Sequence, residues 1–161
     1  MQFEKEISGQ LEDINIFETK HNLNLPAIYK DFLITQNGGN LCDLYTYVNK
    51  DSEYVVNGFF GIKNRENHLD LDIQYANLKT KLPKGYFPIA DDSGGNYYLI
   101  KLKIKKAPIY FWNHNLQASG TKAIGLERIA DSFKNFINGI ELDTTEIKVT
   151  IIETEDSIII S

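Results

Sequence analysis

Apolar side chains recur at helical spacing near the start of the chain. In residues 10–22, Leu11, Ile14 and Phe17 share one face with polar residues between them, which is the pattern of an amphipathic helix. Pro26 suits the first position of a second helix, because its missing N–H costs nothing there. The second helix carries an apolar stripe and ends at two glycines; these residues are Ile28, Tyr29, Phe32, Leu33, Gly38 and Gly39. The pattern therefore predicts a pair of helices before residue 40.

The middle of the chain mixes strand-like and helical patterns. Residues 41–48 and 54–62 are rich in valine, tyrosine and phenylalanine and predict two strands. Residues 67–81 place apolar side chains at helical spacing and predict a helix. Residues 87–90 predict a short strand that runs into a polar, glycine-rich turn at residues 91–96.

The last part of the chain again favours strands around one helix. Residues 98–105 alternate apolar side chains with lysines and predict a strand with one basic face. Residues 109–112 predict its antiparallel partner, and residues 127–138 predict a helix. Residues 140–161 are expected to add a C-terminal strand or hairpin, because residues 147–152 alternate once more. With no repeat and no linker-like stretch, we expect the whole chain to form a single domain.

Composition supports one ordinary soluble domain. The chain has 161 residues, of which 42% are hydrophobic and 24% charged, as in typical globular proteins. No apolar run approaches the roughly 18 residues of a membrane span, so no membrane partner is expected. The single cysteine, Cys42, cannot form an internal disulfide, which favours a cytoplasmic location. We expect Cys42 to be a small buried apolar residue.

The net charge of −5 is concentrated at the C-terminal end. Residues 1–140 hold 16 acidic and 16 basic side chains, whereas the last 21 residues hold six acids and one base. A neutral body with an acidic end argues against nucleic-acid binding, which needs a basic surface. It permits a basic protein partner, whose approach the acidic field would accelerate. A solvated acidic tail that only aids solubility explains the same pattern.

No motif in the sequence demands catalysis, a cofactor or a metal. The run Asp92-Ser93-Gly94-Gly95 is similar to the nucleophile loop of chymotrypsin-like proteases, but the residues on either side of it, Asp91 and Asn96, do not fit that loop. A tight hairpin turn explains the run. A calcium loop fails because no glutamate stands at its twelfth position. The three histidines form no ligand-spaced pair and are expected at the surface or in packing: His21, His68 and His114.

Lysines and aromatic residues mark two further features with open interpretations. The basic stripe either keeps the sheet soluble or binds an acidic or polyanionic partner; it consists of Lys101, Lys103, Lys105 and Lys106. The nearby rings either anchor an interface or belong to the core; they are Tyr97, Tyr98, Tyr110 and Trp112.

Four blocks of the chain, in the same order, resemble the SUKH superfamily, which includes yeast cell-wall assembly regulators and many bacterial immunity proteins. The first block runs from Leu25-Pro26 to Asn37-Gly38-Gly39, and a glutamate in the preceding helix is matched by Glu18. The other blocks are residues 87–97, 109–114 and 129–137. The family often has an aspartate where this chain has Asn113, before the histidine.

The resemblance implies an α+β fold, with a twisted and mostly antiparallel sheet flanked by helices. It also implies a protein without catalytic activity that binds other proteins. The leading interpretation is an immunity protein that neutralises a basic bacterial toxin, such as a nuclease. The alternatives are a regulatory or scaffold module, and a small enzyme or ligand-binding domain. Candidate partner-binding residues are Asp91, Asp92, Ser93, Asn96, Trp112, Asn113, His114, Glu153, Glu155 and Asp156.

Overall fold

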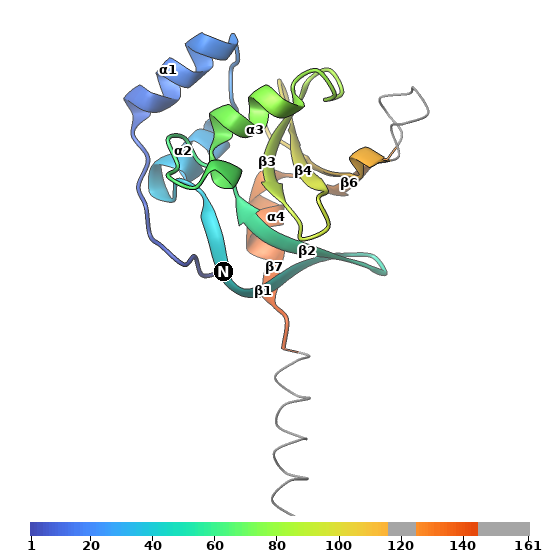
Figure 1. Cartoon of the computed structure of the whole chain (residues 1–161). Helices are drawn as coiled ribbons and strands as arrows, with labels where there is room; N and C mark the ends of the chain where they lie inside the picture. Colours follow the sequence, from blue (N-terminus) through green and yellow to red (C-terminus); the bar gives the residue numbers. More distant parts are fainter. Residues whose placement is uncertain (116–124, 145–161) are drawn as a thin grey trace, which may run out of the picture.

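In the part of the chain that the structure describes, seven strands form one curled sheet in which every strand pairing is antiparallel (Figure 1). The computed structural model describes residues 1–115 and 125–144. In chain order the strands are β1 (Gly39–Asn49), β2 (Ser52–Phe59), β3 (Tyr86–Asp91), β4 (Tyr97–Lys101), β5 (Ile109–Trp112), β6 (Leu126–Ala130) and β7 (Ile140–Leu142). Their order across the sheet is β6-β5-β4-β3-β2-β1-β7. This sheet and its helices confirm the α+β fold.

Helices pack on both sides of the sheet. Within the described residues they are α1 (Leu11–His21), α2 (Ala27–Thr35), the short 3-10 helix η1 (Asn67–Leu69), α3 (Leu71–Leu78) and α4 (Phe133–Gly139). One face lies under α2 and α4, where the Phe136 ring contacts the rings of Phe59 and Tyr98. On the other face, residues of α3 and the loop after it form a second apolar cluster with β4 and β5: Leu78, Leu82, Leu99 and Trp112.

The predicted pair of helices is confirmed, and Glu18 ties the two helices together. The Glu18 carboxylate accepts a hydrogen bond of 2.8 Å from the Leu25 backbone N–H and lies 3.4 Å from the Lys30 ammonium group. Pro26 stands at the N-cap of α2, where a missing N–H leaves no bond unmade. The glutamate of the resemblance therefore has a structural role in this chain.

The segment Asn37-Gly38-Gly39, which follows α2, packs against the part of the chain that follows β2. The buried Asn37 amide donates a hydrogen bond to the Ile62 carbonyl at 2.7 Å and accepts one from the Ile62 N–H at 2.8 Å. Gly38 adopts a φ of +68°, and a Cβ there would lie 2.6 Å from the Phe59 carbonyl oxygen. The same close approach requires glycine at position 61, where an added Cβ would lie 2.0 Å from the backbone carbonyl oxygen of Asn37.

The predicted strand over residues 98–105 is wrong in its second half. β4 ends at Lys101, and the chain then turns, with Lys103 at a φ of +63°. The turn is closed by hydrogen bonds from the Ala107 N–H to the Ile104 carbonyl and from the Lys101 N–H to the Pro108 carbonyl, which bring the chain back to pair as β5. β4 also lacks an exposed basic face, since Tyr98, Leu99 and Ile100 are all fully buried.

The predicted helix over residues 127–138 is a strand followed by a shorter helix. Residues 126–130 form β6, which pairs with β5, and the helix begins only after Ser132. The Ser132 hydroxyl accepts a hydrogen bond from the Asn135 N–H, which is the usual N-cap interaction. Pairing with a distant strand therefore overrides the local helical spacing of Ile129.

Two further expectations meet mixed outcomes. Cys42 is exposed rather than buried, because its neighbour Leu41 is the residue of this stretch whose side chain enters the core. Residues 140–142 form the short strand β7, which pairs with β1, and the strand predicted from the alternation of residues 147–152 lies outside the described residues. No helix in the described part of the chain is long and apolar enough to cross a membrane.

Candidate functional site

Strand pairing brings two groups of predicted site residues to one end of the sheet: those of the 91–96 turn and those at the end of β5, residues 112–114. Asp91 lies opposite Tyr97 across β3 and β4, and Tyr97 lies opposite Trp112 across β4 and β5. The ring centroids of Tyr97 and His114 are 5.6 Å apart. Asp91 and the residues after β5 therefore belong to one continuous surface, with Tyr97 between them.

Burial separates these residues into supporting and accessible ones. Trp112 and Tyr98 have no exposed surface, so the Trp112 ring lies beneath the accessible surface. Tyr97, Asn113 and His114 are half-buried. Among the described residues, three buried polar atoms here find no hydrogen-bond partner: Trp112 Nε1, Asn113 Oδ1 and His114 Nδ1.

Asp91 is a carboxyl group held in a poorly solvated position. Its Oδ1 accepts a long hydrogen bond of 3.4 Å from the Asn57 amide. Burial raises the pKa of Asp91 from 3.8 to about 6, and the charge of Asp92 adds to the rise. The Asn57 hydrogen bond, the charge of His68 and a backbone hydrogen bond from Gly58 oppose the shift without cancelling it. The charged form of Asp91 is therefore incompletely compensated within the described protein.

Asp92 has the opposite environment, because its carboxylate is used by the turn itself. Its Oδ1 accepts hydrogen bonds of 2.8 Å from the backbone N–H groups of Gly94 and Asn96, and its Oδ2 accepts one of 2.9 Å from the Asn96 side chain. This is an Asx-type turn. Asp92 and Asn96 therefore hold the loop in shape, while Ser93 at its tip is exposed.

Replacing Asp92 with alanine is expected to lower the free energy of unfolding by about 1–2 kcal/mol, because three hydrogen bonds of the turn are lost. Ser93→Ala is the matched control in the same turn, and it should leave stability unchanged. Urea unfolding of both variants measures the difference. Equal stability of the two variants would contradict a structural role for Asp92.

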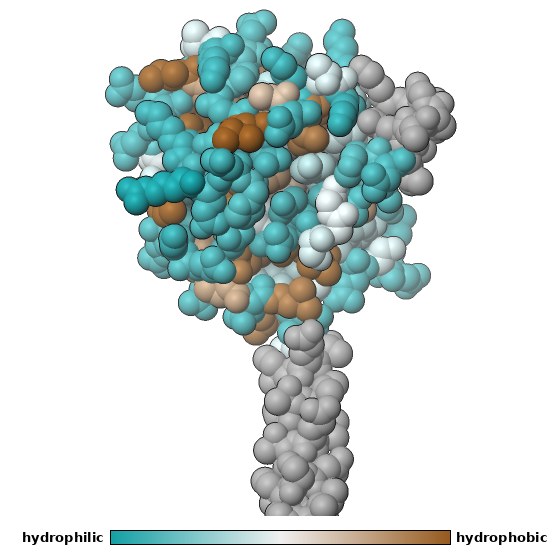
Figure 2. Space-filling view, in the orientation of Figure 1, coloured by the Kyte–Doolittle hydropathy of each residue, from teal (hydrophilic) through white to brown (hydrophobic). Residues whose placement is uncertain are grey.

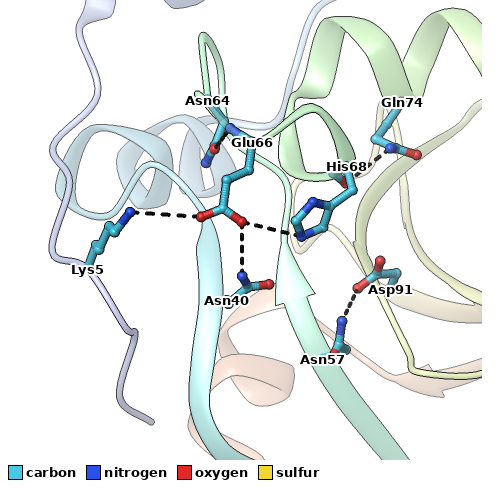
Figure 3. Close-up of polar contacts among 8 residues, drawn as sticks. All are labelled: Lys5, Asn40, Asn57, Asn64, Glu66, His68, Gln74 and Asp91. Carbon is cyan, nitrogen blue, oxygen red and sulfur yellow. Dashed lines mark hydrogen bonds and ion pairs between the residues drawn. The ribbon is translucent and has the colours of Figure 1, made fainter.

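A row of polar side chains continues the surface from Asp91 toward the N-terminal segment. Figure 3 shows the Glu66 carboxylate between three groups from different parts of the chain. Its oxygens lie 3.9 Å from Lys5 Nζ, 3.3 Å from Asn40 Nδ2 and 3.6 Å from His68 Nε2. All three distances exceed those of strong charge-assisted hydrogen bonds, so Glu66 keeps spare acceptor capacity.

A pocket of about 350 Å³ opens beside Glu66. It lies between the N-terminal segment, the start of β1 and the loop that carries Glu66, and its lining includes Lys5, Asn40 and Arg65. We call the accessible surface that runs from this pocket across the sheet end the Asp91 face. It consists of Asn57, Glu66, His68, Asp91, Tyr97 and His114.

The Asp91 face is equipped to accept hydrogen bonds rather than to hold a metal. Within residues 1–115 and 125–144, no three histidine, cysteine or acidic side chains are grouped so that they could hold a metal ion. Hydrophilic residues dominate the view of the molecule in Figure 2, with apolar patches scattered between them. Two carboxylates with long contacts, Asp91 and Glu66, suit the positively charged side chains of a partner.

Most of the chain matches a known protein family. Residues 10–139 match the model of the SMI1 / KNR4 family (SUKH-1). The chain belongs to the SUKH-1 family. The SUKH-1 match runs from α1 to the end of α4, so it includes every residue of the Asp91 face. A search of curated proteins finds no match to the chain.

The SUKH-1 match confirms the resemblance drawn from the four sequence blocks. Its limits exclude Lys5, at the mouth of the pocket, and β7, at the edge of the sheet. Three of the predicted site residues, Glu153, Glu155 and Asp156, lie outside both the match and the described residues. Glu66 and His68 were missed as site residues, since their place beside Asp91 depends on folding and has no local sequence signal.

Proposed function

We propose that this SUKH-1 protein is a non-catalytic immunity protein, which binds and neutralises a basic bacterial toxin in the cytoplasm. The observation that carries the proposal is Asp91, a half-buried carboxyl group whose charge the fold does not fully compensate. Ionisable groups with strongly shifted pKa values cluster at functional sites, and a charge that destabilises the free protein gains its counter-charge when a partner binds. Asp92, one position later, lacks this property.

The charge of such a partner follows from the chemistry of its own target. Toxins that cleave nucleic acids need basic surfaces to hold phosphates. A protein that presents carboxylates in a hydrophilic surface competes for those basic side chains, and the attraction speeds association. Asp91 and Glu66 supply the carboxylates on the Asp91 face, and the acidic residues Glu153, Glu155 and Asp156 would add to the field.

A binding role fits the site better than a catalytic one. Asp92, the only other carboxylate of the turn, is saturated by hydrogen bonds. The pocket beside Glu66 is bordered by exposed side chains such as Lys5, which is 71% exposed, rather than by buried and fixed groups. Catalysis requires groups held rigidly in place, whereas mobile charged side chains are typical of the rim of an interface.

Growth rescue tests the proposal directly. The protein is co-expressed with the product of the neighbouring gene, tested as the candidate toxin, and cell growth and co-purification of the pair are measured. We expect the wild type to restore growth and to form a complex of equimolar composition. Asp91→Asn should rescue growth less well than Asp31→Asn, a matched change at an exposed carboxylate on α2. The proposal fails if the pair does not co-purify and growth is not restored. A stable complex with cellular proteins but with no toxin would instead identify a scaffold module.

A further inference from the structure

A second charged surface lies at the other end of β3 and β4, about 15 Å from the Asp91 face along the strands. It is built from two connections, the loop over residues 79–85 and the turn over residues 102–108. The Leu102 N–H donates to the Gly85 carbonyl at 2.8 Å, which holds the two connections together. We call this surface the lysine end. Its members are Lys79, Lys81, Lys84, Lys101, Lys103, Lys105 and Lys106.

Backbone hydrogen bonds hold the lysine-bearing turn in a defined shape. Lys103 and Ala107 both have positive φ angles, of +63° and +52°. The Ala107 N–H donates to the Ile104 carbonyl at 2.9 Å, and Ala107 is fully buried. The Lys106 carbonyl accepts a bond of 3.1 Å from the Phe133 N–H at the start of α4. Because the turn is ordered before binding, a partner would not bear the entropy cost of ordering it.

The positive charges of the lysine end are not neutralised within the described part of the chain. None of its seven lysines forms an ion pair there, whereas ion pairs engage four other lysines and one arginine: Lys5, Lys20, Lys30, Lys63 and Arg128. Between residues 79 and 106 the only acids are Asp91 and Asp92, which lie at the opposite end of the strands. A surface of mixed positive and negative charges is enough to keep a protein soluble. Solubility alone therefore does not explain why the lysines gather at one end of the strands and the acids at the other.

An exposed apolar side chain stands among these lysines. Ile104 is 44% exposed and borders a depression of about 320 Å³ between the turn and the start of α2. The depression is also lined by Lys103, Lys105 and Lys30. The carboxylate of Glu18 lies 3.4 Å from Lys30 and occupies that lysine, which leaves Lys103 and Lys105 for a ligand.

We propose that the lysine end binds an acidic segment of a partner protein, with carboxylates on the lysines and an aliphatic side chain on Ile104. Charge complementarity carries the assignment. The aromatic residues here favour a peptide over a nucleic acid. Lys101 Nζ lies 4.1 Å above the ring of Tyr86, and the Tyr86 and Tyr110 rings meet edge to face at 5.0 Å. These rings are engaged with each other and with Lys101, so they do not offer the free faces on which bases stack.

Fluorescence anisotropy with a labelled peptide tests the proposal. The probe is a short peptide of glutamate and aspartate residues around one leucine, and the protein is the full chain at low ionic strength. The double variant Lys103→Gln/Lys105→Gln should bind the peptide about tenfold more weakly than the wild type, because two ionic contacts are lost. Backbone amide signals of Lys101, Ile104 and Tyr110 should shift when the peptide is added to the wild type.

The control is Lys50→Gln/Lys63→Gln, which makes the same change in net charge away from the lysine end. Its residues match Lys103 in conformation, with φ angles of +56° and +57°, and this variant should bind like the wild type. If both double variants lost the same amount of peptide affinity, the proposal would be overturned, because the loss would then follow from net charge alone. Tighter binding of a single-stranded DNA oligonucleotide than of the peptide would also overturn it and would identify a surface for polyphosphates.

Discussion

Asn37→Ala is expected to destabilise the protein by about 3 kcal/mol, because both bonds of the buried amide to Ile62 are lost. Ile62 is itself only 5% exposed, so water does not replace the missing partner. The loss corresponds to a fall in the melting temperature of roughly 10 °C for a domain of this size. Asn37 is also the residue that fixes the loop carrying Glu66, so its removal loosens one side of the Asp91 face.

Thermal and urea unfolding measure this effect, with Asn24→Ala as the control at an exposed position close to α2. Asn37→Asp provides a second test in case the alanine variant does not fold. It keeps the acceptor for the Ile62 N–H but lacks the donor for the Ile62 carbonyl, so it should also be destabilised. Loss of less than about 1 kcal/mol in Asn37→Ala would contradict the assigned role.

Asp91→Asn is expected to stabilise the free protein at pH 7 by roughly 1–2 kcal/mol. Asparagine keeps the shape of the protonated carboxyl group and removes a charge that the fold accommodates poorly. The full shift of the Asp91 pKa, from 3.8 to about 6, would correspond to about 3 kcal/mol, and partial solvation reduces that figure. Mutations that raise stability at a functional site are expected where function requires an unfavourable residue.

The pH dependence gives this prediction a defined sign. Because the pKa of Asp91 is higher in the folded protein than in the unfolded chain, the folded state binds more protons between pH 4 and pH 6. The contribution of Asp91 to stability therefore falls as pH rises through this window. The advantage of Asp91→Asn over the wild type should be close to zero near pH 4 and complete near pH 7. Chemical unfolding at both pH values measures it, and an advantage that is the same at both would refute the buried charge as its cause.

Local signals predicted the helix pair well, because proline, the apolar stripe and the glycines all act within a few residues. The same reasoning misplaced the end of β4 and took β6 for a helix. Alternation of lysine and apolar residues continues past Lys101 in the sequence, but the chain turns at Lys103, and the Ala107 N–H bond to the Ile104 carbonyl closes that turn. The local spacing around Ile129 suits a helix, yet pairing with β5 decides the conformation. Both errors arise where a distant partner outweighs local preference.

The candidate site divides in the same way. Asp91 and Asp92 were both predicted from the turn that contains them. Their surroundings distinguish Asp91, which we propose binds a partner, from Asp92, whose carboxylate accepts the hydrogen bonds that stabilise the turn. Glu66 and His68 carry no local signal, because their position depends on a bond between Asn37 and Ile62, 25 positions apart. Contacts of such separation are not visible in residue patterns.

The central claim is tested most directly by measuring how tightly the wild type, Asp91→Asn and Asp31→Asn bind the proposed toxin partner. Isothermal titration calorimetry at pH 7 should show binding at least about tenfold weaker for Asp91→Asn, as expected when a charged contact at an interface is lost, and unchanged binding for Asp31→Asn. Since Asp91→Asn is also predicted to be the more stable protein, misfolding would not explain the loss. Equal affinity of all three proteins would contradict the assignment of the Asp91 face as the binding surface.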